Sequence, residues 1–394
     1  MELMTEEKKK FQRTEIGLIP SEWSFEEIGP KIDLLSGNPF SSSGYSDHGV
    51  RLLRGANIKR GNTQWDDDNT KFWPKNDPSL KKYKLKPDDL VIAMDGSLVG
   101  RSYAFLSEQD VPSFLLQRVA RIRSDKIDTK YLKYFIGSSW FVDYCDSVKT
   151  NTAIPHISST DIKNFKIPLP PTLEEQQAIA SALSDVDELI RSLDGLIQKK
   201  QAIKKGTMQQ LLSGNKRLPG FDGEWEVKKL GELAENISSG KSNTKSNVGK
   251  YPIYGSTGII GRSSSYDYRG DKILVARVGA NAGTVNQVNG EYNVSDNTLM
   301  INLKTSVSID FVRYFLVEYD LGTLIFGSGQ PLITGGQLKK LDICIPDLEY
   351  QNKIVEILSD MDRELQTLRQ KREKYVQIKQ GMMQELLTGK TRLV

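Results

Sequence analysis

The sequence predicts an α/β protein in which two β-rich domains are joined by two long, antiparallel coiled-coil helices, with pseudo-two-fold symmetry. Three observations predict it: a length of 394 residues, a long internal duplication, and a heptad pattern inside the duplicated stretch. One hydrophobic core rarely organises so many residues, so more than one domain is expected. The predicted order is a first domain, a central helix, a second domain and a C-terminal helix, at 1–170, 171–214, 215–345 and 346–394.

The duplication is clearest in the helices. Residues 171–218 match residues 346–393 without a gap, with 21 identities in 48 pairs. Similarity continues upstream with small shifts. The paired segments are "IPHISSTDIKNFKIPLP" (154–170) with "QPLITGGQLKKLDICIP" (330–346), "YLKYFI" (131–136) with "FVRYFL" (311–316), and "DDLVIAMDGSLVG" (88–100) with "DKILVARVGANAG" (271–283). A repeat of this length indicates two copies of one structural unit.

One connection is found only once along the chain. After the first helix, "SGNKRLPGFDGEW" (213–225) leads into the second domain, whereas the second helix is followed by "TGKTRLV" (388–394). The segment "QRTEIGLIPSEW" (12–23) resembles the continuation that the second copy lacks. If the two helices are antiparallel, we expect residue 394 to return to the start of the first domain, which closes the pseudo-two-fold arrangement.

Apolar residues in both helices follow a spacing of alternately three and four, which is typical of a coiled-coil seam. About 40 residues at 1.5 Å each give a helix of about 60 Å. Pairing within one chain is favoured over a zipper between two chains, because the chain carries both matched helices. Gly206 and Gly381 recur at the same place, which predicts either a close approach of two backbones or a kink. The predicted helix-pairing residues are Ile179, Leu183, Val186, Ile190, Leu193, Ile197, Gly206, Ile354, Leu358, Met361, Leu365, Leu368 and Gly381.

The domains contain short β-rich runs between loops rich in Gly, Ser and Asn. Examples are "DDLVIAM", "RVARIR", "KILVARV" and "NTLMINL". A short amphipathic helix is expected near "YLKYFIGSSWF" and near "FVRYFLVEY". This pattern favours α/β domains with a mainly antiparallel sheet.

Composition places few limits on function. Hydrophobic residues make up 38% of the chain and charged residues 26%, and the net charge is +4 with a pI near 8.7. Nucleic acid is therefore permitted as a partner, but it must be bound by local basic patches. No apolar run reaches the 18 residues of a membrane span, and "MELMTEEKKK" is no secretory signal. Cys145 and Cys344 suggest no disulfide framework, so we expect a reducing cytoplasm.

No catalytic motif is complete. "SSGKS" (238–242) and "GSLVGRS" (96–102) both fail the glycine spacing of a phosphate-binding loop. His48 and His156 are far apart in sequence and lack the spacing of a zinc site, so we interpret them as loop or surface residues. Acidic runs such as "WDDD" (65–68) are explained as solvated turns. We therefore predict no catalytic residue, no metal and no cofactor on this chain.

The order and duplication of these motifs resemble the specificity subunit of type I restriction–modification systems. The resemblance rests on the helix motif, on the lead-ins "TEIGLIPSEW" and "FDGEWEVKKLGELA", and on "YPIYGSTGIIG" (251–261) with "SDNTLMI" (295–301). It implies two target-recognition domains that each bind half of a bipartite site in double-stranded DNA. It also implies that the helices fix the spacer and dock two DNA adenine methyltransferase subunits. Adenosylmethionine, ATP and Mg²⁺ are then expected on the methyltransferase and restriction/translocase subunits, with no membrane partner.

Base-reading residues should be long polar or charged side chains on loops beside the strands. The candidates in the first domain are Arg54, Asn57, Lys59, Arg60, Arg101, Ser102, Gln117 and Arg118, with Lys149 and Asn151 as phosphate contacts. Those in the second domain are Lys241, Asn243, Lys245, Tyr254, Ser256, Arg262, Arg277, Asn281 and Asn297. The resemblance does not place these contacts.

Two alternatives remain at this stage. A coiled-coil protein-interaction scaffold would have no affinity for duplex DNA, whereas a DNA-reading subunit should bind DNA in a salt-sensitive way. A self-contained DNA enzyme is disfavoured by the missing cofactor motifs.

Overall fold

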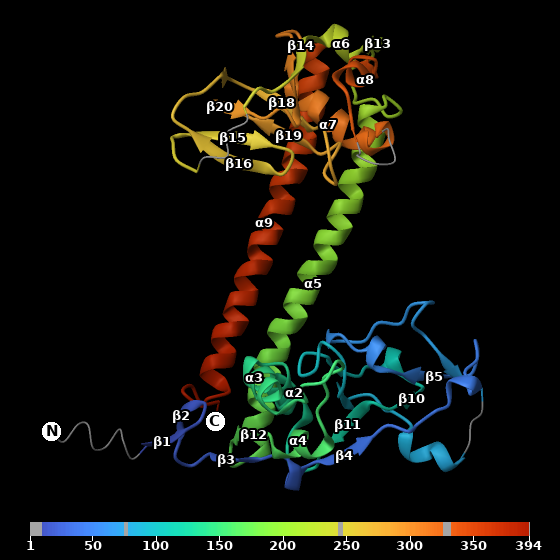
Figure 1. Ribbon diagram of the computed structural model, residues 1–394, viewed down its shortest axis with the longest axis vertical. Coiled ribbons are helices and arrows are strands. Elements are labelled where there is room, and N and C mark those ends of the chain that lie inside the picture. Colours follow the sequence, from blue (N-terminus) through green and yellow to red (C-terminus); the bar gives the residue numbers. More distant parts are fainter. Residues whose placement is uncertain (1–9, 75–77, 243–246, 326–331, 394) are drawn as a thin grey trace, which may run out of the picture. The chain divides into compact units, whose positions relative to one another are not determined.

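The computed structural model describes residues 10–74, 78–242, 247–325 and 332–393. The chain forms two compact units, of which the first contains residues 1–191 and 373–394 and the second contains residues 192–372. The division runs through both long helices, so each unit consists of one domain and one segment of each helix (Figure 1).

The long helices lie within the predicted ranges 171–214 and 346–394, with α5 at Leu173–Leu212 and α9 at Leu348–Leu386, so the second helix ends eight residues before the predicted bound. The side chain of Thr172 accepts a hydrogen bond from the N–H of Glu175 (3.2 Å), and Asp347 accepts one from Tyr350 (2.9 Å). Such caps satisfy N–H groups that a helix start leaves unpaired. The chain leaves both helices through a glycine with positive φ, which terminates a helix without a steric penalty.

Ion pairs show that the helices are antiparallel. In the second unit, Asp194 pairs with Arg372 (2.9 Å) and Lys204 pairs with Asp362 (2.5 Å), so the numbers rise on one helix as they fall on the other. Arg372 stands at the position where the next apolar seam residue after Leu368 would lie, and its charge is paired there with Asp194.

Each helix carries its best buried seam residues near its N-terminal end. Ile179 and Leu183 are fully buried in the core of the first unit, and Ile354 and Leu358 in that of the second. These positions therefore pack against a domain as well as along the helix pair. Further along, Leu193 and Leu365 are buried, while the remaining apolar seam positions are half-buried, namely Val186, Ile190, Ile197, Met361 and Leu368.

The close approach predicted at the two helix glycines is wrong. A Cβ atom placed on Gly206 or Gly381 would meet no atom within 4 Å. Both glycines lie inside continuous α-helix. Their recurrence therefore reflects the duplication of the sequence rather than a packing requirement.

The first unit contains one five-stranded sheet, in the order β4-β11-β8-β9-β6, and one three-stranded sheet, in the order β10-β5-β7. Two antiparallel pairs complete the strands, namely the hairpin of β1 with β2 and the long-range pair of β3 with β12. The strands are β1 (Phe11–Thr14), β2 (Gly17–Pro20), β3 (Ser24–Glu27), β4 (Asp33–Ser36), β5 (Val50–Leu53), β6 (Arg60–Gly61), β7 (Phe72–Trp73), β8 (Leu90–Ala93), β9 (Tyr103–Phe105), β10 (Ser113–Leu115), β11 (Val119–Arg123) and β12 (Lys166–Leu169). The helices of its domain are α2 (Thr129–Ile136), α3 (Ser139–Val148) and α4 (Ser159–Asn164).

The second unit repeats this plan with two four-stranded sheets, β14-β21-β18-β19 and β16-β15-β20-β17, and the pair β13 with β22. Its strands are β13 (Glu226–Lys229), β14 (Ala234–Ser239), β15 (Tyr251–Gly255), β16 (Gly258–Ser263), β17 (Tyr268–Arg269), β18 (Lys272–Ala276), β19 (Val285–Val288), β20 (Glu291–Val294), β21 (Thr298–Leu303) and β22 (Asp342–Ile345). Its domain helices are α6 (Leu230–Leu233), α7 (Ile309–Tyr319) and α8 (Gly335–Lys339). Most strand pairs are antiparallel, which confirms the predicted sheet type.

The main core of each unit lies between the helices and one sheet, which is β4-β11-β8-β9-β6 in the first unit and β14-β21-β18-β19 in the second. In the first unit, residues from α2, such as Tyr131 and Phe135, pack with Ile122 of β11 and with Leu387 beyond the end of α9. Burying an aromatic or branched side chain of this size contributes about 1.5–3 kcal/mol. The core therefore fastens each domain to both long helices.

One polar contact is repeated where the domain helix meets the long helices. In the first unit, the hydroxyl of Tyr134 donates to Asp187 (2.9 Å), which also pairs with Lys379 (2.6 Å). In the second unit, Tyr314 donates to Asp362 (2.7 Å), which pairs with Lys204. We call these two sets the junction triads. Each one links α2 or α7 to both long helices.

Candidate nucleic-acid interface

The central strands of both units end in the same backbone arrangement. In the first unit, the N–H of Met94 donates to the carbonyl of Arg118 (3.0 Å), and in the second, Arg277 donates to Asn297 (3.0 Å). The strands β8 and β18 then lead into loops that contain two glycines with positive φ at matched positions, Gly96 and Gly100 or Gly279 and Gly283. Glycine adopts this conformation without strain, so both loops fold the same way.

Two further segments reach the same end of each sheet. The carbonyl of Met94 accepts from Ile157 (2.9 Å), and that of Arg277 accepts from Ile333 (2.9 Å). The second sheet of each unit joins there as well, because the N–H of Leu116 donates to the carbonyl of Leu53 (3.1 Å) in the first unit, and that of Ser295 donates to Tyr254 (2.8 Å) in the second. We call the resulting surface the loop edge. In the first unit it comprises residues 54–60, 95–102, 117–118 and 150–156, and in the second it comprises residues 255–257, 278–284 and 296–297.

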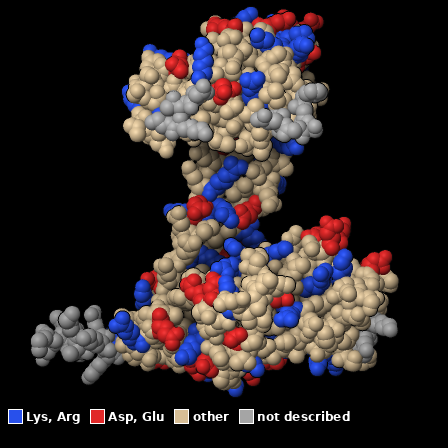
Figure 2. All heavy atoms as spheres, viewed as in Figure 1, with Lys and Arg blue, Asp and Glu red and all other residues tan. Residues whose placement is uncertain are grey.

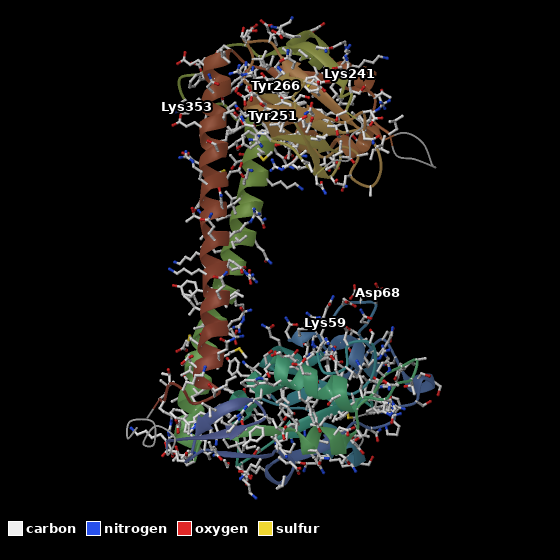
Figure 3. The ribbon with its side chains drawn as sticks, turned by 60° about the vertical axis from the view of Figure 1, so that its left-hand side comes forward. Lys59, Asp68, Lys241, Tyr251, Tyr266 and Lys353 are labelled. Carbon is white, nitrogen blue, oxygen red and sulfur yellow. The ribbon has the colours of Figure 1, made fainter. Side chains whose placement is uncertain are left out.

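Most of the predicted cationic residues of the first unit lie on its loop edge. Lys59, Arg60 and Arg118 are exposed, and Arg54 is half-buried. Figure 3 shows Lys59 at the surface of this unit. The Nε atom of Arg118 lies 3.9 Å from a carboxylate oxygen of Asp95, a separation at which the guanidinium keeps its hydrogen-bond donors available. Gln117 and Asn151, which we also predicted, are exposed.

Two predicted readers of the first unit are buried in the loop. Asn57 is fully buried, and its Oδ1 accepts from the N–H of Arg54 (3.2 Å) while its Nδ2 donates to the carbonyl of Gln64 (3.1 Å). Ser102 is also buried, and its backbone is bonded to Leu98 and Ala93. The Asn57 side chain holds the loop in shape, and neither buried side chain is available to a base, so we remove both from the set of proposed DNA contacts.

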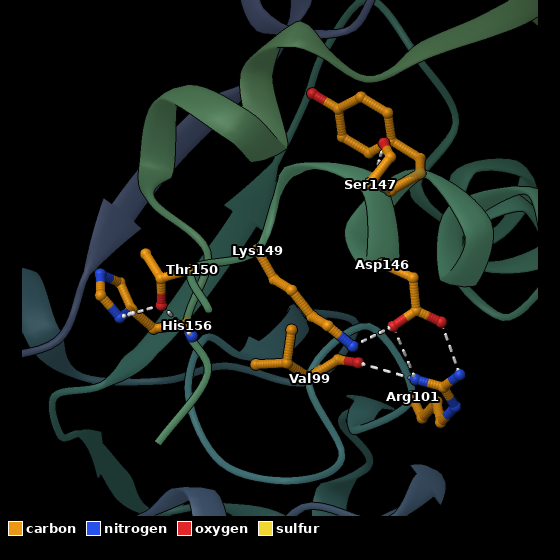
Figure 4. A network of polar contacts seen from close by, with 8 residues as sticks. Val99, Arg101, Asp146, Ser147, Lys149, Thr150 and His156 are labelled. Atoms are coloured by element: carbon orange, nitrogen blue, oxygen red, sulfur yellow. Dashed lines mark hydrogen bonds and ion pairs between the residues drawn. The ribbon is translucent and has the colours of Figure 1, made fainter. Parts of the chain in front are cut away.

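Two other predicted cationic side chains are paired with a carboxylate of the same unit. Arg101 and Lys149 both bond to Asp146 of α3, at 2.7 Å and 2.6 Å (Figure 4). The hydrogen bond from Arg101, followed by that from Lys149, lowers the pKa of Asp146 to about 2. The carboxylate is therefore ionised at neutral pH, and it competes with any phosphate for these two cations.

In the second unit the exposed predicted residues are Lys241, Arg262, Asn281 and Asn297. Ser256 and Arg277 are half-buried. Tyr254 packs edge-on against Tyr292, with ring centroids 5.8 Å apart, so it supports the sheet β16-β15-β20-β17. Asn243 and Lys245 lie outside the described residues.

Charge does not gather into one large patch on the face that Figure 2 displays. Lys and Arg side chains are interspersed there with Asp and Glu in each unit. An exposed aromatic residue adds contact area in the second unit, where Tyr266 lies against the half-buried Tyr251 with ring centroids 5.0 Å apart (Figure 3). The loop edges thus offer varied hydrogen-bonding groups rather than uniform positive charge.

The family is decided by sequence comparison. The family model described as "Type I restriction modification DNA specificity domain" matches residues 55–204 and again residues 222–377. These two matches cover well over half of the chain. The chain belongs to this family. Each match contains one loop edge and the adjoining segment of a long helix.

Curated relatives agree with this type I specificity family. The MjaVIII specificity subunit of Methanocaldococcus jannaschii is 33% identical over 55% of this chain and 51% of its own length. The EcoAI specificity subunit of Escherichia coli is 32% identical over 53% of this chain and 33% of its own length. The chain thus spans about half the length, or less, of these two relatives. The putative MjaX specificity subunit of M. jannaschii is 26% identical over 98% of this chain and 97% of its own length.

A solved structure supports the fold. The S subunit of a type I restriction–modification system from M. genitalium has a TM-score of 0.64 and 18% identity, over 93% of this chain and 96% of that one. At this identity the likeness concerns the fold, which it extends to nearly the whole chain.

The sequence prediction did not include Asp95 and Thr150, which both lie on the first loop edge. Asp95 forms a bridge with His156, and the His156 ring bonds to the Thr150 hydroxyl (2.9 Å; Figure 4). His156 is half-buried and serves the loop, as we expected for a loop histidine. The duplication could have pointed to this segment, because "IPHIS" (154–158) aligns with "QPLIT" (330–334) and so belongs to the structure that both units share.

The described residues give no support for metal chemistry. Within the described ranges, no three His, Cys, Asp or Glu side chains form a group that could hold a metal ion. Burial raises the pKa of the Cys145 thiol to about 12, so this cysteine is unreactive at neutral pH. Among the helices that the structure describes, none has both the length and the apolar character needed to span a bilayer.

Proposed function

We propose that this chain is the DNA-binding specificity subunit of a type I restriction–modification complex, and that each unit recognises one half of a bipartite target. The observation that carries this proposal is the duplicated loop edge. The same backbone frame occurs in both units and holds different side chains. Two such surfaces on one chain suit a target with two different half-sites.

The long helices fit a second role in the same proposal. They set the number of base pairs between the half-sites and dock two DNA adenine methyltransferase subunits. The junction triads support this role, because each one ties a recognition domain to both helices. Catalysis then takes place on partner subunits, which carry adenosylmethionine, ATP and Mg²⁺, and the complex works in the cytoplasm, where its DNA lies. A protein with this fold has been solved in the context of complex assembly of a type I restriction–modification system.

The test is to co-express the chain with the methyltransferase encoded beside it and to sequence the host DNA for N6-methyladenine. The expected result is one bipartite motif with a fixed spacer, which is absent when either chain is omitted. Unmethylated DNA from cells that contain the intact complex would overturn the proposal in favour of a scaffold without a DNA role.

A paired deletion sharpens the test. Removing one heptad from the middle of α5 and one from α9 shortens each helix by about 10 Å and turns its faces by only about 20°. We expect the spacer to change or methylation to be lost, with the bases of the half-sites unaltered. Removing a heptad from only one helix is the control, and it should destabilise the chain because the ion pairs lose their register.

A further inference from the structure

One position is structurally the same in both units but differs in chemistry. Arg118 and Asn297 each precede the central strand of their unit, β11 or β21. The carbonyl of each accepts the matched hydrogen bond from Met94 or Arg277. The residue that follows each of them, Val119 or Thr298, is buried and bonds back across a three-residue turn.

The surroundings make these side chains available to a ligand. Both residues are exposed, although the strands that they begin are buried. Their backbone carbonyls are already bonded to the sheet, so the side chain is the part left to make contacts. The side chain of Arg118 is 56% exposed, and its nearest carboxylate, Asp95, lies 3.9 Å away.

A nearby acid argues against a role in phosphate binding at either position. Asp95 stands beside Arg118, and the exposed Asp296 directly precedes Asn297. Each carboxylate reduces the local attraction for the DNA backbone, which carries one negative charge per phosphate. A base edge is a better partner, because it offers donors and acceptors instead of charge.

We infer that Arg118 reads a guanine in the first half-site and that Asn297, at the same structural position, reads an adenine in the second. This inference rests on the proposed function and assigns base identities within it. The guanidinium fork donates two hydrogen bonds to guanine O6 and N7, whereas a carboxamide accepts one from the N6 amino group of adenine and donates one to its N7. Each such bidentate pair discriminates against a wrong base by about 1–3 kcal/mol.

The experiment uses the full chain co-expressed with its methyltransferase, and the methylated motif is read from the host DNA. With Arg118→Ala, one guanine position in one half-site should become degenerate, and with Asn297→Ala, one adenine position in the other half-site. Methylation at the original sites should fall roughly 10- to 100-fold, in line with the loss of one bidentate pair. Lys126→Ala is the control, because Lys126 is exposed beyond the opposite end of β11 and should leave the motif unchanged.

A second variant separates base reading from charge. Arg118→Lys keeps the positive charge but loses the planar fork, so guanine discrimination should weaken, though less than with Arg118→Ala, because an ammonium can still donate to guanine O6 and N7. This variant also serves if Arg118→Ala does not fold. A uniform loss of methylation with an unaltered motif would indicate a phosphate contact and overturn the inference, as would variants with the original motif and the original level. Absence of methylation with the unsubstituted chain would instead refute the proposed function.

Discussion

In both units the chain that leaves a long helix packs against a tryptophan, and we call this place the corner of the unit. One continuous segment connects the helix to the tryptophan in the second unit, whereas two distant segments meet in the first. In the second unit, the chain leaves α5 through Gly214 and continues to Trp225, and the Arg217 guanidinium lies 5.1 Å from the centre of that indole ring. In the first unit, the chain leaves α9 through Gly389, and the corresponding tryptophan comes from the distant segment that contains Trp23.

The two corners are stabilised by different contacts. In the second unit, Tyr350 stacks on Phe221 with ring centroids 4.4 Å apart, and its hydroxyl accepts from the N–H of Leu218 (2.7 Å). In the first unit, the position of Tyr350 is taken by Glu175, which is almost fully buried and pairs with Arg392 (2.7 Å). The same arginine also pairs with Glu22. Ion pairs thus replace the aromatic stack where two separate segments must be held together.

The largest difference should follow from removing the arginine of each corner. Arg392→Ala leaves Glu175 buried without its partner, which should cost about 3 kcal/mol in the unfolding of the first unit. Arg217→Ala removes a hydrogen bond to a carbonyl and a contact with an aromatic face, so about 1 kcal/mol is expected. Thermal and urea unfolding of the full chain would measure both. Equal losses would show that the ion pairs contribute nothing beyond the shared geometry.

The glycines of the two corners offer a second matched pair. Both have positive φ, +68° at Gly389 and +71° at Gly214, so alanine at either position is strained by about 1–2 kcal/mol. A Cβ at Gly389 would also lie 2.6 Å from the ring of Pro20, whereas at Gly214 its nearest neighbour is 3.4 Å away, in Trp225. Gly389→Ala should therefore destabilise the chain by about 1 kcal/mol more than Gly214→Ala. The prediction fails if the two variants have the same midpoint of urea unfolding.

The junction triads should behave alike. Tyr134→Phe and Tyr314→Phe each remove one hydrogen bond to a carboxylate, and each should cost about 1.5 kcal/mol. The two losses should add in the double variant, since the sites share no partner. A double variant that is much more stable than the sum would mean that the two junctions are coupled.

One junction also predicts a dependence on pH. Burial acts to raise the pKa of Asp362, but the hydrogen bonds from Lys204 and Tyr314 outweigh it, and the pKa is lowered. A lowered carboxyl pKa stabilises the fold above the ordinary value near 4, and this contribution is lost as the pH falls below it. Asp362→Asn should flatten the acid limb of a stability–pH curve for the second unit. An unchanged acid limb would exclude this ion pair as its cause.

The smallest expected effect concerns the loop edge of the first unit. Asp146→Ala should release Arg101 and Lys149 for phosphate, so the complex should bind DNA a few-fold more tightly at low salt. The slope of log K against log salt concentration should also become more negative by about 2, because two more phosphates are neutralised. Asp143→Ala removes the same charge from α3 without freeing either cation, and it should leave the slope unchanged. A slope that stays constant in both variants would exclude these cations from the interface.

The sequence predicted the features that depend on local pattern. The presence and order of the long helices, the β-rich runs and the short amphipathic helices followed from periodicity and duplication, and the structure confirms them. Contacts between distant segments were not predictable in this way. Asp146 neutralises Arg101 across 45 positions, and Asn57 is buried by a loop that folds over it. Gly206 and Gly381 misled us because a recurring residue in a duplicated sequence need not have a packing role.

The hydrogen bonds that frame each loop edge join backbone atoms. Because any residue except proline supplies the same N–H and carbonyl groups, side chains such as Arg118 and Asn297 can be exchanged without disturbing the frame. Substitutions at these positions should change the free energy of unfolding little, so many different side chains can be accommodated there. The loop edge is therefore a surface whose side chains can evolve while its backbone stays the same. The two units illustrate this, since they share the backbone frame and differ in the side chains that it carries.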